Sequence, residues 1–189
     1  MPTKFPLENA EALLSQSRPG AVDPNYVVAE LPLRTFHFVA DIGCGPGYLT
    51  IPLAKYLYDG KVYAIDVQQG MLDIVEREAK AAHVQNVETV LSRETKLPLE
   101  DNSVDLALMS NVLHEASYPT RLIRDAARIV KKGGWIAILE WRKQEMRVGP
   151  PLDERVAQED VEEILEKLEL TVKARRIIGD IRYLLLVEK

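Results

Sequence analysis

Short apolar runs alternate with amphipathic segments along most of this 189-residue chain. The runs at 36–42, 104–109 and 135–139 are apolar almost throughout, which is typical of strands that a parallel sheet buries on both faces. The segments 122–130 and 161–168 instead place their apolar residues at helical spacing, so each forms one apolar stripe. This alternation predicts an α/β fold, with βαβ units built on a parallel sheet.

Strand-length runs are predicted at 36–42, 61–67, 86–91, 104–110, 134–141, 170–177 and 181–188. Only Gly179 and Asp180 separate the last two, which is too short for a crossover, so these two form an antiparallel hairpin. Residues 142–157 are predicted as a loop. We expect a single domain over residues 1–189, with the core at 35–189. Residues 1–34, which are rich in proline and hold one predicted helix near 7–16, would form a cap.

Composition excludes several classes of protein. The chain has 24 Lys and Arg against 29 Asp and Glu, and this net acidic balance argues against a dedicated nucleic-acid-binding face. Its one cysteine, Cys44, permits no internal disulfide and no site built on several thiolates, which fits a reducing cytoplasm. We expect no metal site, no membrane span and no signal peptide, because no metal-spaced cluster and no long apolar run is present.

Three glycines at alternate positions, Gly43, Gly45 and Gly47, lie between an apolar strand and a predicted helix. Glycine tolerates positive φ and lets a ligand approach the backbone, and the helix N-terminus that follows offers free N–H groups. The stretch therefore indicates a nucleotide- or nucleoside-binding turn at the carboxyl edge of an open sheet. The third glycine comes one residue too early for the dinucleotide pattern G-x-G-x-x-G, which counts against a nicotinamide-dependent oxidoreductase.

Several motifs occur in a fixed order along the chain. Asp41 precedes the glycines in the pattern D-x-G-x-G-x-G, and Asp66 ends an apolar strand about 20 residues later. Leu97-Pro98 and D-N-S-x-D at 101–105 follow, then the turn after the fourth strand, then Lys132-Gly133-Gly134. This ordered set, over about residues 36–188, resembles the class I S-adenosylmethionine-dependent methyltransferases. Within them it is similar to the type-11 branch, which includes ubiquinone- and menaquinone-biosynthesis enzymes.

The resemblance implies a Rossmann-like, three-layer, doubly wound sheet of seven strands, mostly parallel, in the order 3-2-1-4-5-7-6 with strand seven antiparallel. It implies S-adenosyl-L-methionine as the cofactor. The cofactor-binding residues it suggests are Asp41, Gly43, Cys44, Gly45, Gly47, Asp66, Val67, Met71, Glu94 and Asn111. Asp66 would accept hydrogen bonds from the ribose, although a helix N-cap explains it as well. Glu94 would face the adenine, although the family's acidic position aligns with Arg93. Val67 and Met71 fit ordinary packing equally well.

The acceptor side is less defined by the sequence. His114, beside Glu115 in the turn after the fourth strand, either takes a proton from the acceptor or only lines the pocket. Tyr26, Tyr48, Tyr118 and Trp141 are candidates for an aromatic wall, with a core role for Trp141 as the alternative. The resemblance implies in-line methyl transfer from the cofactor. Because the sequence lacks an Asn-Pro-Pro-Tyr turn and a second cysteine, we expect a small-molecule acceptor. The alternative function is cofactor binding, or a partner role, without turnover.

Overall fold

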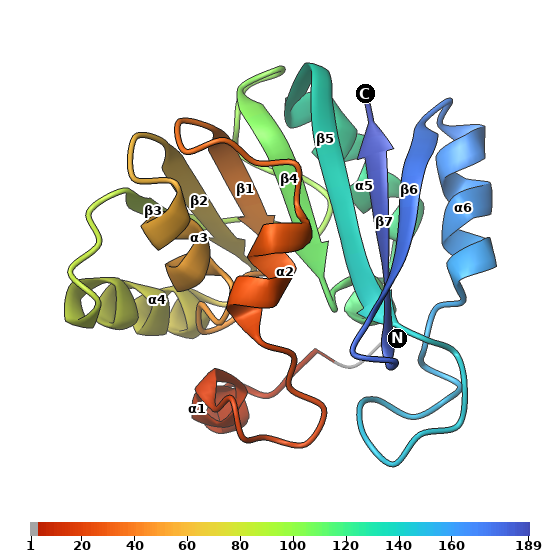
Figure 1. Ribbon diagram of the computed structural model, residues 1–189, viewed down its shortest axis with the longest axis horizontal. Helices are drawn as coiled ribbons and strands as arrows, with labels where there is room; N and C mark the ends of the chain where they lie inside the picture. The colour runs from red at the N-terminus through yellow and green to blue at the C-terminus, as the bar shows by residue number, and fades with distance from the viewer. Residues whose placement is uncertain (1–3) are drawn as a thin grey trace.

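The computed structural model describes residues 4–189 as one seven-stranded sheet with helices on both faces (Figure 1). The strands are β1 (Phe38–Ile42), β2 (Lys61–Asp66), β3 (Val87–Leu91), β4 (Val104–Ser110), β5 (Val130–Trp141), β6 (Thr171–Ile178) and β7 (Arg182–Glu188). The helices are α1 (Ala10–Leu14), α2 (Pro24–Glu30), α3 (Thr50–Tyr56), α4 (Gln69–Ala81), α5 (Pro119–Ile129) and α6 (Gln158–Lys167). Two short 3₁₀ turns, η1 (Leu7–Asn9) and η2 (Leu113–Glu115), complete the set.

The strand order is β3-β2-β1-β4-β5-β7-β6, as predicted. The pairs from β3 to β5 are parallel, whereas β7 runs antiparallel to both β5 and β6. The chain leaves β1 toward β2 on one side and returns to β4 on the other. The carboxyl ends of β1 and β4 therefore form the point where strand order reverses, which is where open α/β sheets bind their ligands.

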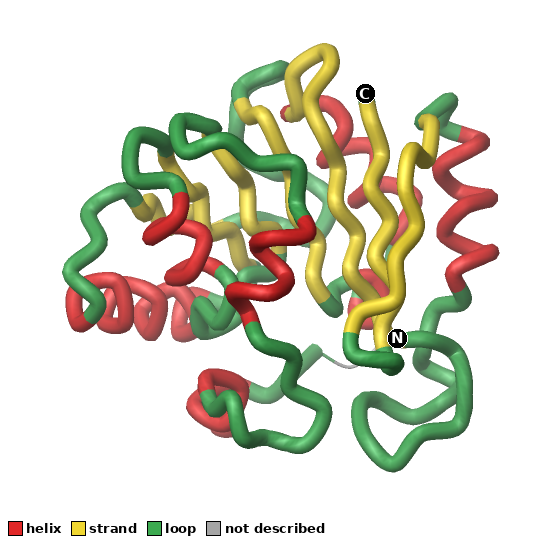
Figure 2. Tube along the Cα trace, in the orientation of Figure 1, coloured by secondary structure: helices red, strands yellow, loops and turns green. Residues whose placement is uncertain are grey.

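Two helical layers sandwich the sheet, because successive side chains of each strand point to opposite faces. Val39 and Leu108 pack with residues of α2 and α3, whereas Ala40 and Met109 pack with residues of α5 and α6. Ala64 joins Leu72 of α4 in a smaller cluster, so α4 covers β2 and β3. The tube drawing shows the resulting three layers, with the strands between helices (Figure 2).

The structure differs from the prediction at β5 and in the N-terminal segment. β5 begins at Val130 instead of 134, because Val130 pairs with Val104 and a register shift accommodates the polar residues that follow. The helix α2 was not predicted. The Asp23 side chain accepts a hydrogen bond from Asn25 N, and Pro24 occupies the first turn, so proline starts this helix instead of breaking it.

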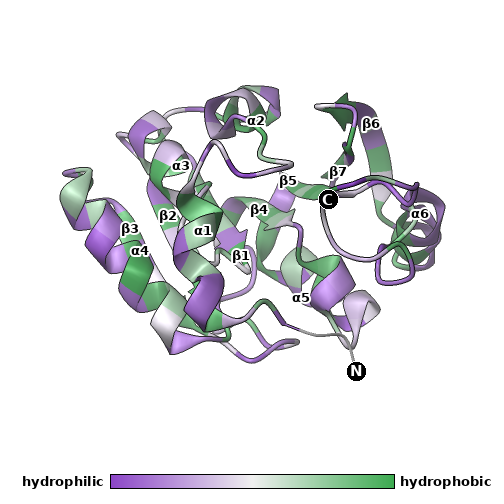
Figure 3. Ribbon diagram, turned by 90° about the horizontal axis from the view of Figure 1, so that it is seen from below, coloured by the Kyte–Doolittle hydropathy of each residue, from purple (hydrophilic) through white to green (hydrophobic). Residues whose placement is uncertain are grey.

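Two irregular segments lie under the carboxyl ends of the parallel strands. Figure 1 shows α1 and the loop after β5 below the sheet, and Figure 3 views the molecule from that side. The loop is held by Arg155, which is buried and donates to the backbone carbonyls of Pro150 and Val148 (2.8 and 2.9 Å). No helix within residues 4–189 is long and apolar enough to cross a membrane.

Candidate active site

A cavity of about 630 Å³ lies where the strand order reverses. The N-terminal segment and the loop after β5 contribute to its walls, together with the tips of β1, β2, β4 and β5. Of the residues suggested by the sequence, it is lined by Asp41, Gly43, Cys44, Gly45, Tyr48, Asp66, Val67, Met71, Glu94, Asn111, His114 and Trp141. The structure thus brings twelve of the fifteen candidate residues to one cavity, from segments far apart in the chain.

The glycine turn folds back onto the end of β2. The backbone N–H groups of Gly43 and Cys44 both donate to the Ile65 carbonyl (2.7 and 3.0 Å). Gly43 and Gly45 have φ of 67° and 52°, a region that L side chains rarely adopt. A Cβ on Gly43 would lie 2.4 Å from Val112, so this glycine permits close packing, whereas a Cβ on Gly45 would meet no atom within 4 Å. The backbone at Gly45 therefore lies open for a ligand.

Gly47 does not line the cavity. Its φ is 97°, and an added Cβ would lie 3.3 Å from Val75 of α4. Its role in the structure is to turn the chain into α3 beside α4. All three glycines adopt positive φ, which this residue type tolerates, but their alternate spacing does not separate the glycine that shapes the turn from those that face the cavity.

Asp66 is anchored under the glycine turn. Its Oδ2 accepts a hydrogen bond from Gly45 N and its Oδ1 from Gln68 N, both at 2.9 Å. Burial raises the pKa of the Asp66 carboxyl, and these backbone hydrogen bonds oppose the rise. Each carboxylate oxygen keeps a second lone-pair direction, so the group can still accept hydrogen bonds from a diol in the cavity.

Asp41 lies deeper in the same cavity. The Thr50 hydroxyl donates to its Oδ2 at 2.6 Å, and 2% of the residue is exposed. Burial raises the pKa of the Asp41 carboxyl to about 6, with the charge of Asp66 adding to the effect and the Thr50 hydrogen bond opposing it. An ionised carboxylate at this depth is stabilised by a cationic ligand.

Glu94 reaches the cavity, whereas its neighbour Arg93 is exposed and does not line it. The Glu94 carboxylate accepts hydrogen bonds from the backbone N–H groups of Ser117 and Tyr118 and from the Ser117 hydroxyl. Lys4 lies 3.9 Å from it. The geometry therefore supports Glu94 over position 93 as the carboxylate at this end of the cavity.

Apolar and neutral groups fill the wall between these carboxylates. Val67 and Met71 line the cavity beside Asp66, and Met71 is almost completely buried. Burial raises the pKa of the Cys44 thiol well above its usual value, so this thiol stays protonated. Asn111, at the end of β4, adopts a φ of 55° and accepts a hydrogen bond from Arg182 through Oδ1 (2.9 Å).

His114 forms a buried pair with Glu140 of β5. The His114 Nδ1 atom lies 2.9 Å from Glu140 Oε1, and Nε2 lies 3.8 Å from a carboxylate oxygen of Glu115. Burial alone would lower the pKa of His114, but the hydrogen bond and charge of Glu140, helped by Glu115, outweigh it and raise the pKa. Because Nδ1 faces Glu140, Nε2 is the ring nitrogen that remains for a ligand.

The four aromatic candidates divide into two pairs. Tyr48 and Trp141 line the cavity, and the Tyr48 hydroxyl donates to the Val22 carbonyl (2.8 Å). Tyr26 and Tyr118 do not line it: they are 47% and 54% exposed. Tyr26 is on the outer side of α2, whose buried residues are at other positions, and the Tyr118 ring stacks on an arginine 4.8 Å away.

Sequence reasoning missed two residues of the site, Glu140 and Arg182. Glu140 is fully buried, and Arg182 lines the cavity with 4% of its surface exposed. Each lies within a predicted strand among apolar neighbours, and a charged residue in such a run is a signal for a buried, partnered group. That signal was present in the sequence, although it does not say which cavity the group faces.

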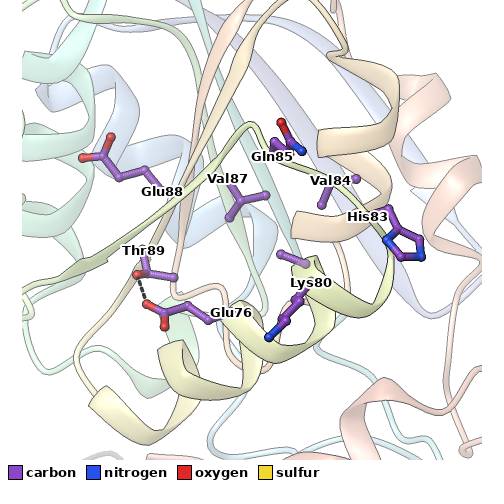
Figure 4. A pocket seen from close by; sticks show the side chains of 9 residues that line it. Glu76, Lys80, His83, Val84, Gln85, Val87, Glu88 and Thr89 are labelled. Atoms are coloured by element: carbon purple, nitrogen blue, oxygen red, sulfur yellow. Dashed lines mark hydrogen bonds between the residues drawn. The ribbon is translucent and has the colours of Figure 1, made fainter.

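A second hollow, of about 610 Å³, lies between the end of α4 and the edge strand β3 (Figure 4). Its walls include Lys80, His83 and Glu88, and the Thr89 hydroxyl donates to Glu76 at 2.7 Å. None of the candidate residues lines it. The candidate active site is therefore the cavity at the strand tips.

Comparisons with known proteins identify the family of this chain. The family model described as "Methyltransferase domain" matches residues 40–138, which include the glycine turn, Asp66, Glu94 and the turn after β4. The solved structure of an S-adenosylmethionine-dependent methyltransferase from Aquifex aeolicus is 33% identical, with a TM-score of 0.92. That similarity covers 97% of this chain and 98% of the other.

Two curated relatives are each 30% identical over part of the chain. One is a demethylmenaquinone methyltransferase of Symbiobacterium thermophilum, matched over 61% of this chain and 47% of its own length. The other is the mitochondrial 2-methoxy-6-polyprenyl-1,4-benzoquinol methylase of Caenorhabditis elegans, matched over 60% of this chain and 41% of its own length. The chain thus matches less than half the length of these relatives. From the family model and the full-length structural match, the chain belongs to the S-adenosylmethionine-dependent methyltransferase domain family.

Proposed function

We propose that this protein transfers a methyl group from S-adenosylmethionine to a small-molecule acceptor by in-line displacement. The observation that carries the proposal is the juxtaposition of the open backbone at Gly45 with the carboxylates of Asp41 and Asp66 around one cavity. The names of the two curated relatives, a benzoquinol methylase and a demethylmenaquinone methyltransferase, support a small molecule as the acceptor.

The residues at the strand tips fit the parts of this cofactor. Asp66 would accept hydrogen bonds from the ribose hydroxyls. Glu94, at the β3 end of the cavity, would accept a hydrogen bond from the adenine amino group. Asp41, buried and with its pKa raised to about 6, would stabilise the cationic methionyl end. Val67 and Met71 would pack against the adenine, and Gly45 leaves the backbone approach free.

When bound, the cofactor supplies an electrophilic methyl group on a sulfonium. The contribution of the protein is then mainly alignment of the acceptor with that methyl group, which is worth up to about 7–11 kcal/mol of barrier. Tyr48 and Trp141 form aromatic walls that would orient the acceptor and exclude water.

His114 would act as the proton acceptor when the nucleophile of the acceptor arrives protonated. Its Nδ1 atom is held by Glu140, which leaves Nε2 for the substrate, and its pKa is raised. A positioned general base of this kind contributes about 10²–10⁴-fold to the rate. The rise in the pKa means that the base form becomes available only toward neutral and higher pH.

Calorimetry with S-adenosylhomocysteine tests the proposal. Asp66→Ala is expected to weaken binding at least about 10-fold, since charge-assisted hydrogen bonds to the ribose are lost. Asp73→Ala is the matched control, because Asp73 is an exposed aspartate on neighbouring α4 that accepts a hydrogen bond only within its own helix. Equal affinity in wild type and Asp66→Ala would contradict the ribose placement.

Methyl transfer itself needs a separate assay. Incubation of the protein with methyl-labelled cofactor and a small-molecule extract should move label into a product, and the His114→Ala variant should lower that rate. Binding of the cofactor without transfer to any fraction would favour the alternative of a binding protein without turnover.

A further inference from the structure

Two arginines line the cavity on the side away from Asp66. Arg182, the first residue of β7, is 4% exposed, and Arg18 lies partly buried on the N-terminal segment. Within residues 4–189, neither guanidinium has a carboxylate oxygen within 4.0 Å. Both are therefore cations that face a cavity without a salt-bridge partner.

Neutral groups hold the Arg182 guanidinium in place. Its Nε donates to Asn111 Oδ1 and its Nη1 to the Gly20 carbonyl (2.9 and 2.8 Å). The guanidinium carbon lies 3.7 Å from the centre of the Trp141 ring, so the group stacks on an aromatic face. Nη2 donates no hydrogen bond to any of the described residues. Because every buried side-chain nitrogen among them has a partner, Nη2 is not buried, and it opens onto the cavity.

Arg18, close enough for its charge to act on Arg182, repeats this arrangement. Its guanidinium lies 4.0 Å from the centre of the Tyr48 ring, and its Nη1 donates to the carbonyls of Leu13 and Ser15. Burial lowers the pKa of Arg182 to about 10; the nearby charge of Arg18 adds to the effect, and Glu140 and Tyr48 oppose it. Two like charges that share a partly desolvated wall are unfavourable together, unless an anion enters between or beside them.

The strand order separates Arg182 from the places proposed for the cofactor, whereas Arg18 lies beside Tyr48, directly after the glycine turn. Glu94 and Asp66 follow β3 and β2, and Asp41 and the glycine turn follow β1. Arg182 belongs to β7, which lies beyond β4 and β5 in the sheet. The cavity thus has carboxylates where the adenosine and sulfonium would lie and an arginine toward β7, where the acceptor would enter; Glu154 of the loop after β5 also lines it.

We propose that Arg182 and Arg18 form a subsite for an anionic group of the methyl acceptor, a carboxylate or a phosphate. The inference rests on the proposed function and names its substrate class. A planar guanidinium presents parallel N–H donors that match two oxygens of such a group. Trp141 and Tyr48, each stacked on one of these arginines, would pack against the apolar body of the same molecule.

Benzoate and its neutral isostere benzamide are suitable probes. Each is titrated into the protein saturated with S-adenosylhomocysteine, with tryptophan fluorescence as the readout, because Trp141 adjoins Arg182. Benzoate should bind at least about 10-fold more tightly than benzamide, since its charge adds charge-assisted hydrogen bonds. Arg182→Met should abolish this difference and leave the affinity for S-adenosylhomocysteine within about twofold.

Arg176→Met is the matched control. Arg176 is on β6 of the same hairpin, lies outside the cavity and pairs with Glu30 at 3.0 Å, so its loss should leave the benzoate preference unchanged. Arg18→Gln should also weaken benzoate, and it decides the question if circular dichroism shows that Arg182→Met is unfolded. Then benzoate binding as tight in Arg18→Gln as in wild type would overturn the proposal.

Two other outcomes would overturn it. One is equal affinity of wild type for benzoate and benzamide. The other is an Arg182→Met variant that binds S-adenosylhomocysteine weakly but 5′-methylthioadenosine normally, because the guanidinium would then serve the carboxylate of the cofactor tail. Failure of wild type to bind S-adenosylhomocysteine would refute the proposed function instead, and the two probes would still report the anion preference without it.

Discussion

Replacing Glu140 with glutamine should destabilise the protein and change the titration of His114. Glu140 is fully buried, and its two oxygens accept four hydrogen bonds. Oε1 faces His114 Nδ1 and Trp141 N (2.9 and 2.8 Å), and Oε2 faces the backbone N–H groups of Leu113 and His114 (3.1 and 3.4 Å). The glutamine amide nitrogen must face two of these donors whichever way it turns.

The cost follows from the donors that lose an acceptor. An unsatisfied buried donor costs about 1–3 kcal/mol, so two of them predict a loss of about 3 kcal/mol in the free energy of unfolding. For a chain of this length, that corresponds to a fall in Tm of about 6–12 °C. If the imidazole changes tautomer so that Nδ1 accepts from the new amide, the loss is smaller, but Nε2 then carries the proton and cannot act as a base.

Two measurements check this prediction. Calorimetric melting gives the change in stability, with Glu163→Gln as the control, because Glu163 is exposed on α6 and its pair with Lys167 contributes little to stability. Imidazole ¹⁵N spectra follow the three histidines, and the pKa of His114 should fall because the Glu140 contribution no longer opposes burial. An unchanged Tm together with an unchanged His114 titration would refute the reasoning.

Two further predictions concern the cofactor end of the cavity. Burial raises the pKa of Asp41 from 3.8 to about 6 in the folded state, so the folded state holds this proton more tightly than the unfolded state. About 3 kcal/mol of the free energy of unfolding is therefore lost as pH rises from about 4 to 6. Asp41→Asn should therefore raise Tm more at pH 8 than at pH 4, and affinity for S-adenosylmethionine should fall in wild type, but not in the variant, as pH drops through about 6. Gly45→Ala and Gly133→Ala should each cost about 1–2 kcal/mol, since both glycines have positive φ and open space, yet only Gly45→Ala should lose S-adenosylhomocysteine binding by calorimetry.

The sheet was predictable from sequence because its buried strands are apolar on both faces. The first residues of β5, before Gly134, were not predicted as strand because Lys131 and Lys132 interrupt the apolar pattern. The pairing of Val130 with Val104 follows only from the register of β4. The order of the strands came from the resemblance to a family, because apolar runs alone do not say which strands are neighbours.

The site was predictable where residue type and spacing carry the chemistry, as at Asp41, Asp66 and Gly45. The site was not predictable where the direction in which a side chain points determines its contacts. Tyr26 has the right chemistry but faces solvent on α2, and Glu140 reaches His114 only through the twist and register of β5. Those facts belong to packing between distant segments, which the sequence pattern does not contain.

A crystal structure of the complex with S-adenosylhomocysteine tests the central claim most directly. The account predicts density in the cavity at the strand tips, with the ribose hydroxyls on the Asp66 carboxylate, the ligand against the backbone of Gly45 and the sulfur directed toward His114 and Trp141. A ligand bound elsewhere, or one whose ribose turns away from Asp66, would contradict it.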